Sequence, residues 1–304
     1  MPLLRTEDLS RSFGRLAATA SVNFSVERGE LRSIIGPNGA GKTTFFRLIA
    51  GELPPSAGRI FFKERDITGW PQHRICRLGI GRTEQDEWSV RSHQLAAEAA
   101  RSGRFADEIV PLQVAQRKGD PIPVDSDEGI RKDATVESLA VLEPAFVPGG
   151  TITAGNASQI SDGAAALVVA DRVAAEASGA PIIGEILAYG QIGGSDATLH
   201  ERPAEALLVA LKKAGLDPTD LDLVEINEAF AAVSIWAARM LDIPESKVNV
   251  HGGGVALGHP LGATGARIVV TLINALRARG GGVGAATLCG GGGQGDAIVI
   301  RVDG

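Results

Sequence analysis

The sequence predicts an α/β protein made of two parts that differ in composition. Strand-like and helix-like stretches alternate along most of its 304 residues, which is typical of an α/β fold. A hydrophobic fraction of 44% beside 22% charged residues indicates a chain that buries a core. Its length suits two domains on a prior of about 150 residues each. The amino-acid composition changes near residue 84, where we place the first domain boundary.

In the first part, residues 1–83, short strand-like runs alternate with turns over residues 1–30. LRSII at 31–35 is a compact apolar stretch that predicts a strand, and a glycine-rich loop follows it. TTFFRLIAGEL at 43–53 carries apolar residues at helical spacing, and prolines end that helix before a strand-like RIFF at 59–62. The loop at 36–43 therefore lies between a predicted strand and a predicted helix.

The second part, residues 84–304, opens with an amphipathic helix that starts at residue 84 and is ended by Gly103, and a polar, loop-like stretch follows at 115–135. The later signals predict strands at LDLVEIN (221–227) and KVNVHG (247–252), helices at EAFAAVSIWAARML (228–241) and GATGARIVVTLINALRARG (262–280), and a glycine-turned hairpin at ATLCGGGGQGDAIVIRV (286–302).

Charge and hydropathy exclude several classes of protein. Residues 1–83 contain thirteen basic and seven acidic residues, whereas residues 84–304 contain seventeen basic and twenty-nine acidic residues. The basic residues are scattered singly through apolar sequence, so we expect no nucleic-acid partner. No run of 18 apolar residues occurs, and Arg5 and Asp8 interrupt the stretch that a signal peptide needs. We therefore expect a cytoplasmic protein without a transmembrane segment or signal peptide.

GPNGAGKT at 36–43 has the spacing of a phosphate-binding loop, G-x-x-x-x-G-K-[ST], in the strand-to-helix context that the motif requires. The glycines let backbone N–H groups surround phosphate oxygens, and the helix N-terminus adds partial positive charge. We expect Lys42 to reach the β and γ phosphates of ATP and Thr43 to bind Mg²⁺. A glycine-rich turn without a ligand is the alternative.

Four motifs surround and include this loop: LSRSFG (9–14), VERGE (26–30), IIGPNGAGKTT (34–44) and DITGWPQHRICRLGIGRT (66–83). In these motifs residues 3–83 resemble the beginning of an ABC-transporter ATPase of the branched-chain amino-acid importer type. The resemblance implies a P-loop NTPase fragment whose parent protein docks on membrane permease subunits, with an aromatic residue stacked on adenine. The nucleotide-binding residues that we predict are Phe13, Gly36, Asn38, Gly39, Gly41, Lys42, Thr43 and Thr44.

The resemblance to the ATPase ends after residue 83. The chain continues as RTEQDEW at 82–88 and lacks the family's LSGGQ signature, its strand ending in Asp-Glu and its switch His. Gln85 matches the family's Gln by position only. Because the missing parts anchor Mg²⁺ and position water, we expect nucleotide binding at most. Cys76 has no acid or base motif around it, and we assign it no role.

Three clusters in the second part place a reactive group among small residues: NEAF (227–230), GHPLGATGAR (258–267) and LCGGGGQGD (288–296). Cys289 follows an apolar strand and precedes a glycine run, where backbone N–H groups would lower its pKa or bind an oxyanion. His259 in a Gly-His-Pro turn is a candidate base. Either residue alone is more often a buried structural one, but together they favour a catalytic site.

Long motifs run in order through the second part: EQDEWSVRSHQ (84–94), GRFADEIVP (103–111), DEGIR (127–131), TAGNASQISDGAAA (153–166), DLDLVEINEAFAA (220–232), VNVHGGGVALGHPLGATGAR (248–267) and TLCGGGGQGDA (287–297). Along its whole length this part resembles the thiolase family of acyl-CoA acetyltransferases. The resemblance implies an incomplete αβαβα fold, with loop-domain residues and the end of the N-terminal domain at 84–175 and the C-terminal domain at 176–304.

The thiolase resemblance implies a CoA thioester as substrate and a role for five residues. His259 would activate a nucleophilic thiol and donate to an oxyanion hole, and Asn227 would hold the water that completes this hole. Cys289 would move the substrate α-proton. Gly291 would offer a backbone N–H to a second oxyanion hole, and Ser158 would touch the pantetheine arm of CoA. The thiolase parent would be a homo-oligomer.

Two departures from the thiolase pattern affect these expectations. The family's nucleophilic cysteine belongs to an N-terminal half that this sequence does not contain, so ping-pong transfer lacks its first thiolate. We expect apolar surfaces to be exposed where that half would pack. TLHERP at 198–203 replaces a Met-Gly-x-Gly-Pro segment near the acyl pocket, which leaves the acyl length open. We interpret Glu228 as lying behind the site and His251 as structural.

GIGRTEQDEW at 79–88 satisfies both family patterns, so we place the join at residues 83–85. Three hypotheses follow. The chain is an acetyl-CoA C-acetyltransferase by descent, impaired in forming or cleaving acetoacetyl-CoA. It is an ATP-binding module in which the acidic part is passive. Or it is a chimeric, misassembled chain without evolved activity.

Overall fold

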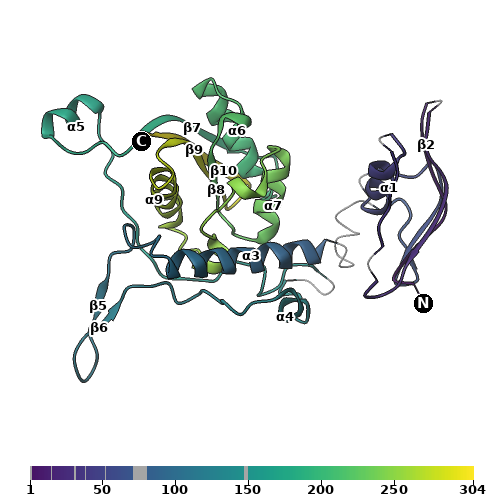
Figure 1. Cartoon of the computed structure of the whole chain (residues 1–304), viewed down its shortest axis with the longest axis horizontal. Helices are drawn as coiled ribbons and strands as arrows, with labels where there is room; N and C mark the ends of the chain where they lie inside the picture. The colour runs from purple at the N-terminus through teal and green to yellow at the C-terminus, as the bar shows by residue number, and fades with distance from the viewer. Residues whose placement is uncertain are drawn as a thin grey trace. The chain divides into compact units, whose positions relative to one another are not determined.

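The computed structural model describes residues 2–14, 16–30, 32–37, 39–51, 53–70, 81–146 and 150–304. The chain divides into two compact units (Figure 1). The first contains Met1–Thr83 and Pro144–Thr151, and the second contains Glu84–Glu143 and Ile152–Gly304. Over these described ranges, no helix combines the length and the apolarity that crossing a bilayer requires.

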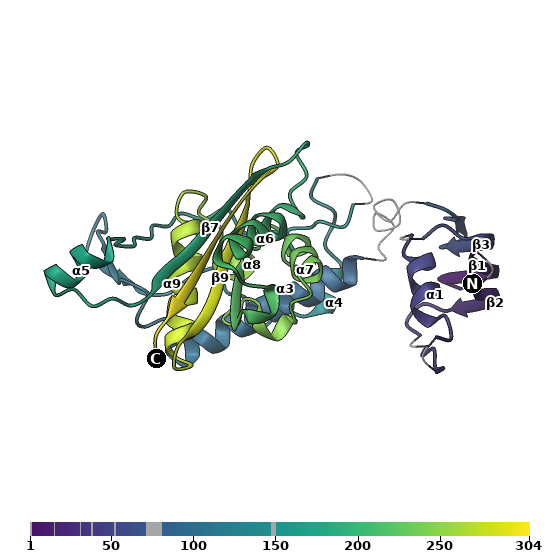
Figure 2. The same cartoon turned by 90° about the horizontal axis from the view of Figure 1, so that it is seen from above.

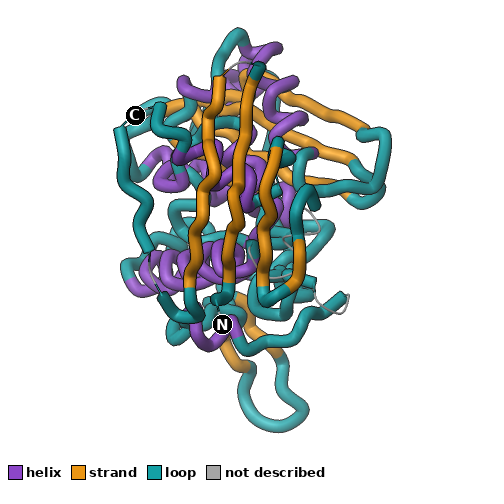
Figure 3. Tube along the Cα trace, turned by 90° about the vertical axis from the view of Figure 1, so that its right-hand side faces the viewer, coloured by secondary structure: helices purple, strands orange, loops and turns teal. Residues whose placement is uncertain are grey.

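In the described residues of the first unit, a helix packs on an antiparallel sheet. The strands of this sheet lie in the order β2-β1-β3-β4 (Figure 3). Their bounds are Leu4–Phe13 (β1), Leu16–Val26 (β2), Ala57–Phe62 (β3) and Arg65–Asp66 (β4), and α1 spans Lys42–Ile49. Phe45 and Leu48 of α1 are buried with Leu9, Ile60 and Phe62 of the sheet. The early strands, the helix and the RIFF strand were all predicted from the sequence.

The predicted strand at 31–35 is wrong for its described residues. Residues 32–35 belong to no strand, and the Ile35 side chain is 93% exposed. A strand is stable only when a neighbouring strand accepts and donates its backbone hydrogen bonds. In the sheet of this unit, no described strand pairs with residues 32–35. Apolar composition alone therefore does not make this segment a strand.

The second unit is built on a mixed sheet in the order β7-β10-β9-β8. Its strands are Glu185–Gly193 (β7), Leu223–Ile226 (β8), Gly282–Gly290 (β9) and Gln294–Val302 (β10). β8 and β9 are parallel, whereas β10 runs antiparallel to both β9 and β7. β9 and β10 form the predicted glycine-turned hairpin. At Gly293 φ is 80°, and a Cβ atom would lie 1.8 Å from the Asp196 carbonyl oxygen, so the turn requires glycine.

Helices cover both faces of this sheet (Figure 2). α6 (Arg202–Ala214) and α7 (Ala231–Met240) pack on one face, and α9 (Thr264–Arg277) packs on the other. Alternation along β8 divides its side chains between these two layers. Val224 and Ile226 belong to the core with α6 and α7, whereas Leu223 belongs to the core with α9. A strand buried on both faces fits the predicted α/β class.

The remaining elements lie around this sandwich. α3 spans Arg82–Arg101, α4 Val136–Ala140, α5 Arg172–Ser178 and α8 Gly254–Leu257, while two 3₁₀ turns span Pro218–Asp220 and Glu245–Lys247. α3 confirms the predicted amphipathic helix. The expected loop at 115–135 is wrong in part, because Leu112–Val114 (β5) and Ile122–Val124 (β6) form a small hairpin.

The predicted strand at 247–252 is also wrong. Val248 forms only an isolated bridge with Val224, and Asn249 has φ of 47°, a left-handed value that interrupts an extended backbone. The Asn249 side chain bonds the end of β8 instead. Its Oδ1 accepts from the Ile226 N–H at 2.8 Å, and its Nδ2 donates to the Ile226 carbonyl at 2.8 Å.

Residues 159–171 belong to no helix or strand. Several large apolar side chains in this stretch face solvent: Ile160 is 106% exposed, Val168 99% and Val169 70%. Exposed apolar surface was expected in the second part, and this stretch provides it.

Candidate active site

Asn227 and Cys289 lie at the carboxyl edge of the two parallel strands. β8 ends at Ile226, which pairs with Thr287 of β9, and the Asn227 N–H donates to the Thr287 carbonyl at 3.0 Å. Cys289 follows two residues later in β9. Asn227 is fully buried and Cys289 is 8% exposed. Because parallel strands end at the same edge of a sheet, the register brings the amide and the thiol to one region of the unit.

His259 reaches this edge from the turn before α9. Its Nε2 atom lies 3.3 Å from Asn227 Nδ2, and its Nδ1 atom lies 2.6 Å from Thr264 Oγ1. Gly258 has φ of 92°, and a Cβ atom there would lie 2.1 Å from Ser161 Oγ. The Gly-His turn therefore needs its glycine, and it holds the imidazole between α9 and the amide that follows β8.

Burial dominates the electrostatics of the thiol and the imidazole. Desolvation raises the pKa of the Cys289 thiol, and a backbone hydrogen bond offsets only part of this effect. The backbone hydrogen bond thus lowers this pKa as expected, but burial outweighs it and the net shift is upward. Burial, followed by the charge of Arg267, lowers the pKa of His259. At neutral pH the site holds a protonated thiol and a neutral imidazole.

The other two predicted thiolase-type residues lie on loops beside these elements. Gly291 begins the turn after β9 and has open space where a side chain would stand. The Ser158 N–H donates to the Ala229 carbonyl at 3.1 Å, and Ala157 bridges Phe230. This pairing lays the segment that contains Ser158 against the chain that leads into α7, close to Asn227 in sequence.

Glu228 has a larger structural role than the sequence indicated. Its fully buried carboxylate accepts four hydrogen bonds. Oε1 accepts from Trp88 Nε1 at 2.8 Å and from Asn249 Nδ2 at 2.9 Å. Oε2 accepts from Ser92 Oγ at 2.7 Å and from the Val255 N–H at 3.1 Å. These bonds satisfy both buried carboxylate oxygens and attach α3 and α8 to the residues that follow β8.

Sequence reasoning missed an acidic cluster on the α9 face of β8. Glu225 is 2% exposed, and burial raises its pKa to about 8. Its Oε2 atom lies 3.6 Å from Nη1 of Arg267, the main group that opposes this shift. Glu108, which accepts from Thr271 Oγ1 at 2.9 Å, also has its pKa raised by burial. The sequence feature that could have revealed it is a Glu in the apolar run LDLVEIN, at a position where the alternation of a strand buries the side chain.

The predicted phosphate loop lies in the first unit. Lys42 opens α1, and its Nζ atom donates to the carbonyls of Gly36 at 2.5 Å and Pro37 at 2.8 Å. Gly39 and Gly41 have φ of 85° and 82°, so the loop turns through left-handed positions before the helix. Thr43 and Thr44 follow in the first turn of α1.

Of the other predicted nucleotide-binding residues, Phe13 is described by the structure and Asn38 is not. Phe13 is 45% exposed, and the Arg11 guanidinium stands 4.9 Å from its ring centroid. Asn38 and Cys76 lie outside the described residues. In the parts of the chain that the structure describes, no group of three or more His, Cys, Asp or Glu side chains is placed to hold a metal ion.

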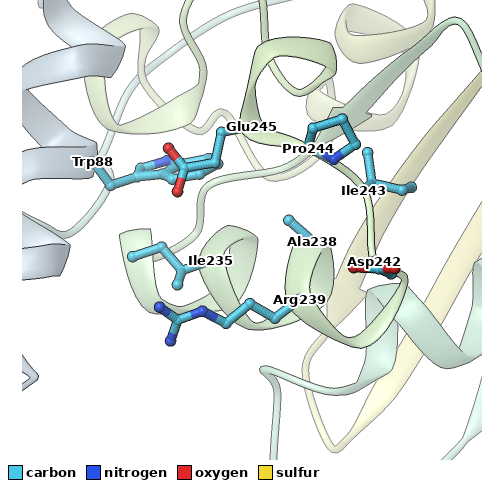
Figure 4. Close-up of a pocket in the computed structure, with 8 residues that line it drawn as sticks. All are labelled: Trp88, Ile235, Ala238, Arg239, Asp242, Ile243, Pro244 and Glu245. Carbon is cyan, nitrogen blue, oxygen red and sulfur yellow. The ribbon is translucent and has the colours of Figure 1, made fainter. Parts of the chain in front are cut away.

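Two cavities of the second unit lie away from the predicted residues. One of about 290 Å³ is lined by Trp88, Ile235, Ala238, Arg239, Asp242, Ile243, Pro244 and Glu245 (Figure 4). Another of about 310 Å³ is lined by Gly103, Arg104, Asp107, His251, Asn274, Arg277 and Ala278. Neither cavity is lined by Asn227, His259 or Cys289. The evidence for the candidate site is therefore the position of these residues at the strand edge and their hydrogen bonds.

Two family models match the chain: the thiolase N-terminal domain over residues 65–173 and the thiolase C-terminal domain over residues 180–302. A probable acetyl-CoA acetyltransferase of Mycolicibacterium smegmatis is 52% identical over 220 residues, which cover 72% of this chain and 57% of that protein. Peroxisomal 3-ketoacyl-CoA thiolase A of Mus musculus is 48% identical over 233 residues, which cover 75% and 55% of the two chains.

The fold agrees with these matches. The crystal structure of the Bacillus anthracis acetyl-CoA acetyltransferase superposes with a TM-score of 0.72 at 44% identity, covering 75% of this chain and 58% of that one. This chain thus spans a little over half the length of its relatives. The N-terminal thiolase match begins at residue 65, inside the stretch 3–83 that resembles an ATPase, and the ATPase resemblance stays a prediction. With its mixed α/β fold and these matches, the chain belongs over residues 65–302 to the thiolase family.

Proposed function

We propose that this chain carries the proton-transfer half of a thiolase-type acetyl-CoA C-acetyltransferase site. The observation that carries the proposal is the partly buried contact between Asn227 Nδ2 and His259 Nε2, at the strand edge where Cys289 is the second-to-last residue of β9. A thiol whose pKa is raised by burial is a proton donor at neutral pH. Cys289 therefore suits the return of a proton to the α-carbon of a CoA thioester enolate, the step that follows cleavage of acetoacetyl-CoA.

His259 and Asn227 complete this half-site. The neutral imidazole can accept a proton from a thiol and then donate it to a thioester oxyanion. Asn227 Oδ1 is a buried acceptor that finds no hydrogen-bond partner among the described residues. We assign this atom to a bound water that would complete the oxyanion hole, while the Gly291 N–H serves the second hole and Ser158 the pantetheine arm.

We propose that complete acyl transfer is impaired. Ping-pong transfer needs one thiolate to take the acyl group and a second cysteine to move the proton. The sequence contains Cys76 and Cys289 only. Cys289 occupies the proton-transfer position, and Cys76 belongs to the motif at 66–83 that resembles an ATPase.

Deuterium exchange tests the proposal. The full chain is incubated with acetyl-CoA in D₂O, and deuterium at the α-carbon is followed by mass spectrometry. We expect exchange by the natural chain and by Cys76→Ala, and none above background by Cys289→Ala. Equal exchange by Cys289→Ala would contradict the assignment of Cys289. In a parallel assay with acetoacetyl-CoA and CoA, steady thiolysis that Cys289→Ala abolishes would contradict the impairment.

A second candidate function is ATP binding at residues 36–44. The observation that favours it is Lys42 at the start of α1, directly after a loop that turns at Gly39 and Gly41. The loop amides and Lys42 would hold phosphates and Thr43 would hold Mg²⁺, with no residue to activate water. ATP titration with Mg²⁺ should show binding that Lys42→Ala removes and Lys63→Ala retains. Absence of binding to the natural chain would eliminate this function.

We also propose that the chain joins parts of two proteins near residues 83–85. The two compact units divide between Thr83 and Glu84, which supports a join there, although the thiolase match extends back to residue 65. A single DNA read across the codons for residues 60–110 tests it. A read that contains the join shows a fused gene. A read in which the ATPase sequence continues to its signature motif shows a misassembled chain.

A further inference from the structure

Thr264, the first residue of α9, connects His259 to a backbone carbonyl. Its fully buried Oγ1 atom lies 2.6 Å from His259 Nδ1 and 2.9 Å from the Pro260 carbonyl oxygen. A hydroxyl group has one hydrogen, and a carbonyl oxygen only accepts. The threonine hydrogen is therefore donated to Pro260. The threonine oxygen then accepts from His259, which requires a proton on Nδ1.

The opposite side of the imidazole imposes the same requirement. Nε2 faces Asn227 Nδ2 at 3.3 Å, and the NH₂ group of an amide donates but does not accept. Nε2 must therefore present a lone pair. Each neighbour on its own selects the tautomer with hydrogen on Nδ1. Burial and the charge of Arg267, which lower the pKa of His259, keep a second proton off the ring at neutral pH.

We propose that Thr264 is a positioning residue that holds His259 as the Nδ1–H tautomer, with the Nε2 lone pair directed to the site. The proposal deepens the proposed function. When a thiol meets this site, its S–H bond breaks, the proton forms a bond to Nε2, and the sulfur keeps the electron pair as a thiolate. The imidazolium retains its Nδ1–H bond to Thr264, so the ring does not turn between accepting and donating a proton.

Nitrogen-15 NMR of the histidine rings tests this tautomer directly. The full chain is labelled at histidine nitrogens, and His259 is assigned by the signal that disappears in His259→Gln. At neutral pH we expect a protonated Nδ1 and an unprotonated Nε2. Thr264→Val keeps the side-chain shape but removes the hydroxyl, so the Nε2–H tautomer should increase several-fold. Thr264→Ser restores the hydroxyl and should restore the natural pattern.

Thr271→Val provides the matched control. Thr271 is a second buried threonine of α9, but it bonds Glu108 rather than the imidazole, so its loss should leave the His259 signals in place. A natural chain with Nε2 protonated, or a folded Thr264→Val with unchanged His259 signals, would overturn the proposal. If Thr264→Val unfolds, the natural chain and Thr264→Ser still decide it. The NMR spectra are recorded without substrate and therefore do not depend on the proposed function. If they show the expected tautomer but the chain does not exchange deuterium into acetyl-CoA, the proposed function is contradicted and the role of Thr264 is not.

Discussion

Burial, more than hydrogen bonding, sets the character of the individual reactive residues. Cys289 was expected to be activated by the N–H groups of its glycine turn, yet its nearly complete removal from water raises the pKa of the thiol. The same cause lowers the pKa of His259. Both groups are therefore uncharged at neutral pH, which suits residues that pass a proton rather than hold a charge.

A buried, protonated thiol should react slowly with electrophiles. In a Cys76→Ala background, we expect iodoacetamide to alkylate Cys289 at pH 8 at least about tenfold more slowly than it alkylates a cysteine peptide, because the thiolate is the nucleophile. The same protein in urea, where Cys289 is exposed, serves as the control and should react like the peptide. Alkylation of the folded protein at the peptide's rate would show an exposed, ionised thiol instead.

Secondary structure was predicted best where periodicity was long and neighbours were close in sequence. α9 and the β9–β10 hairpin match their patterns because the apolar face of Leu272 and Leu276 and the glycine turn are local signals. The strands expected at 31–35 and 247–252 failed because a strand depends on a partner that its own residues do not specify. Asn249 also adopts a left-handed conformation, which strand propensity does not anticipate.

For the candidate site, the sequence identified the residues but not their long-range contacts. Asn227, His259 and Cys289 stand in distinct motifs among small residues, and the strand edge brings their elements together. The four donors to Glu228 come from positions as distant as Trp88, so only the fold reveals them. The pKa of Glu225 likewise depends on Arg267, which is 42 residues away in sequence.

The acid in the middle of β8 should make stability depend on pH. Burial raises the pKa of Glu225 from 4.5 to about 8, so the folded chain binds a proton that the unfolded chain releases between these values. The free energy of unfolding should therefore fall as pH rises through this window, by about 1.4 kcal/mol per pH unit. Glu225→Gln should remove this slope and be the more stable protein at pH 8.

Urea unfolding at pH 5, 6.5 and 8, followed by tryptophan fluorescence, measures the slope. The comparison between natural chain and variant cancels other groups such as His93, whose pKa of about 4 acts with the opposite sign between pH 4 and 6.5. Glu98→Gln, at an exposed position of α3, should keep the natural slope. Parallel curves for the natural chain and Glu225→Gln would contradict a shifted acid in β8.

At the scale of the whole molecule, the irregular stretch 159–171 leaves apolar side chains in solvent, and we expect it to drive self-association. Val168→Lys places a charge at a 99% exposed position and should lower the associated fraction in sedimentation velocity at equal concentration. Val141→Lys, at a 77% exposed position after α4, is the control and should associate like the natural chain. Equal association of all three proteins would exclude this stretch as the contact.

The pH profile of deuterium exchange into acetyl-CoA tests most directly whether the buried thiol acts at the α-carbon. Removal of the α-proton needs the thiolate, and burial raises the pKa of Cys289. We therefore expect a Cys289-dependent rate that climbs through neutral pH and levels only above the ordinary pKa of cysteine, about 8.5. A rate that is the same at every pH, or that Cys289→Ala leaves intact, would contradict a proton-transfer role for this half-site.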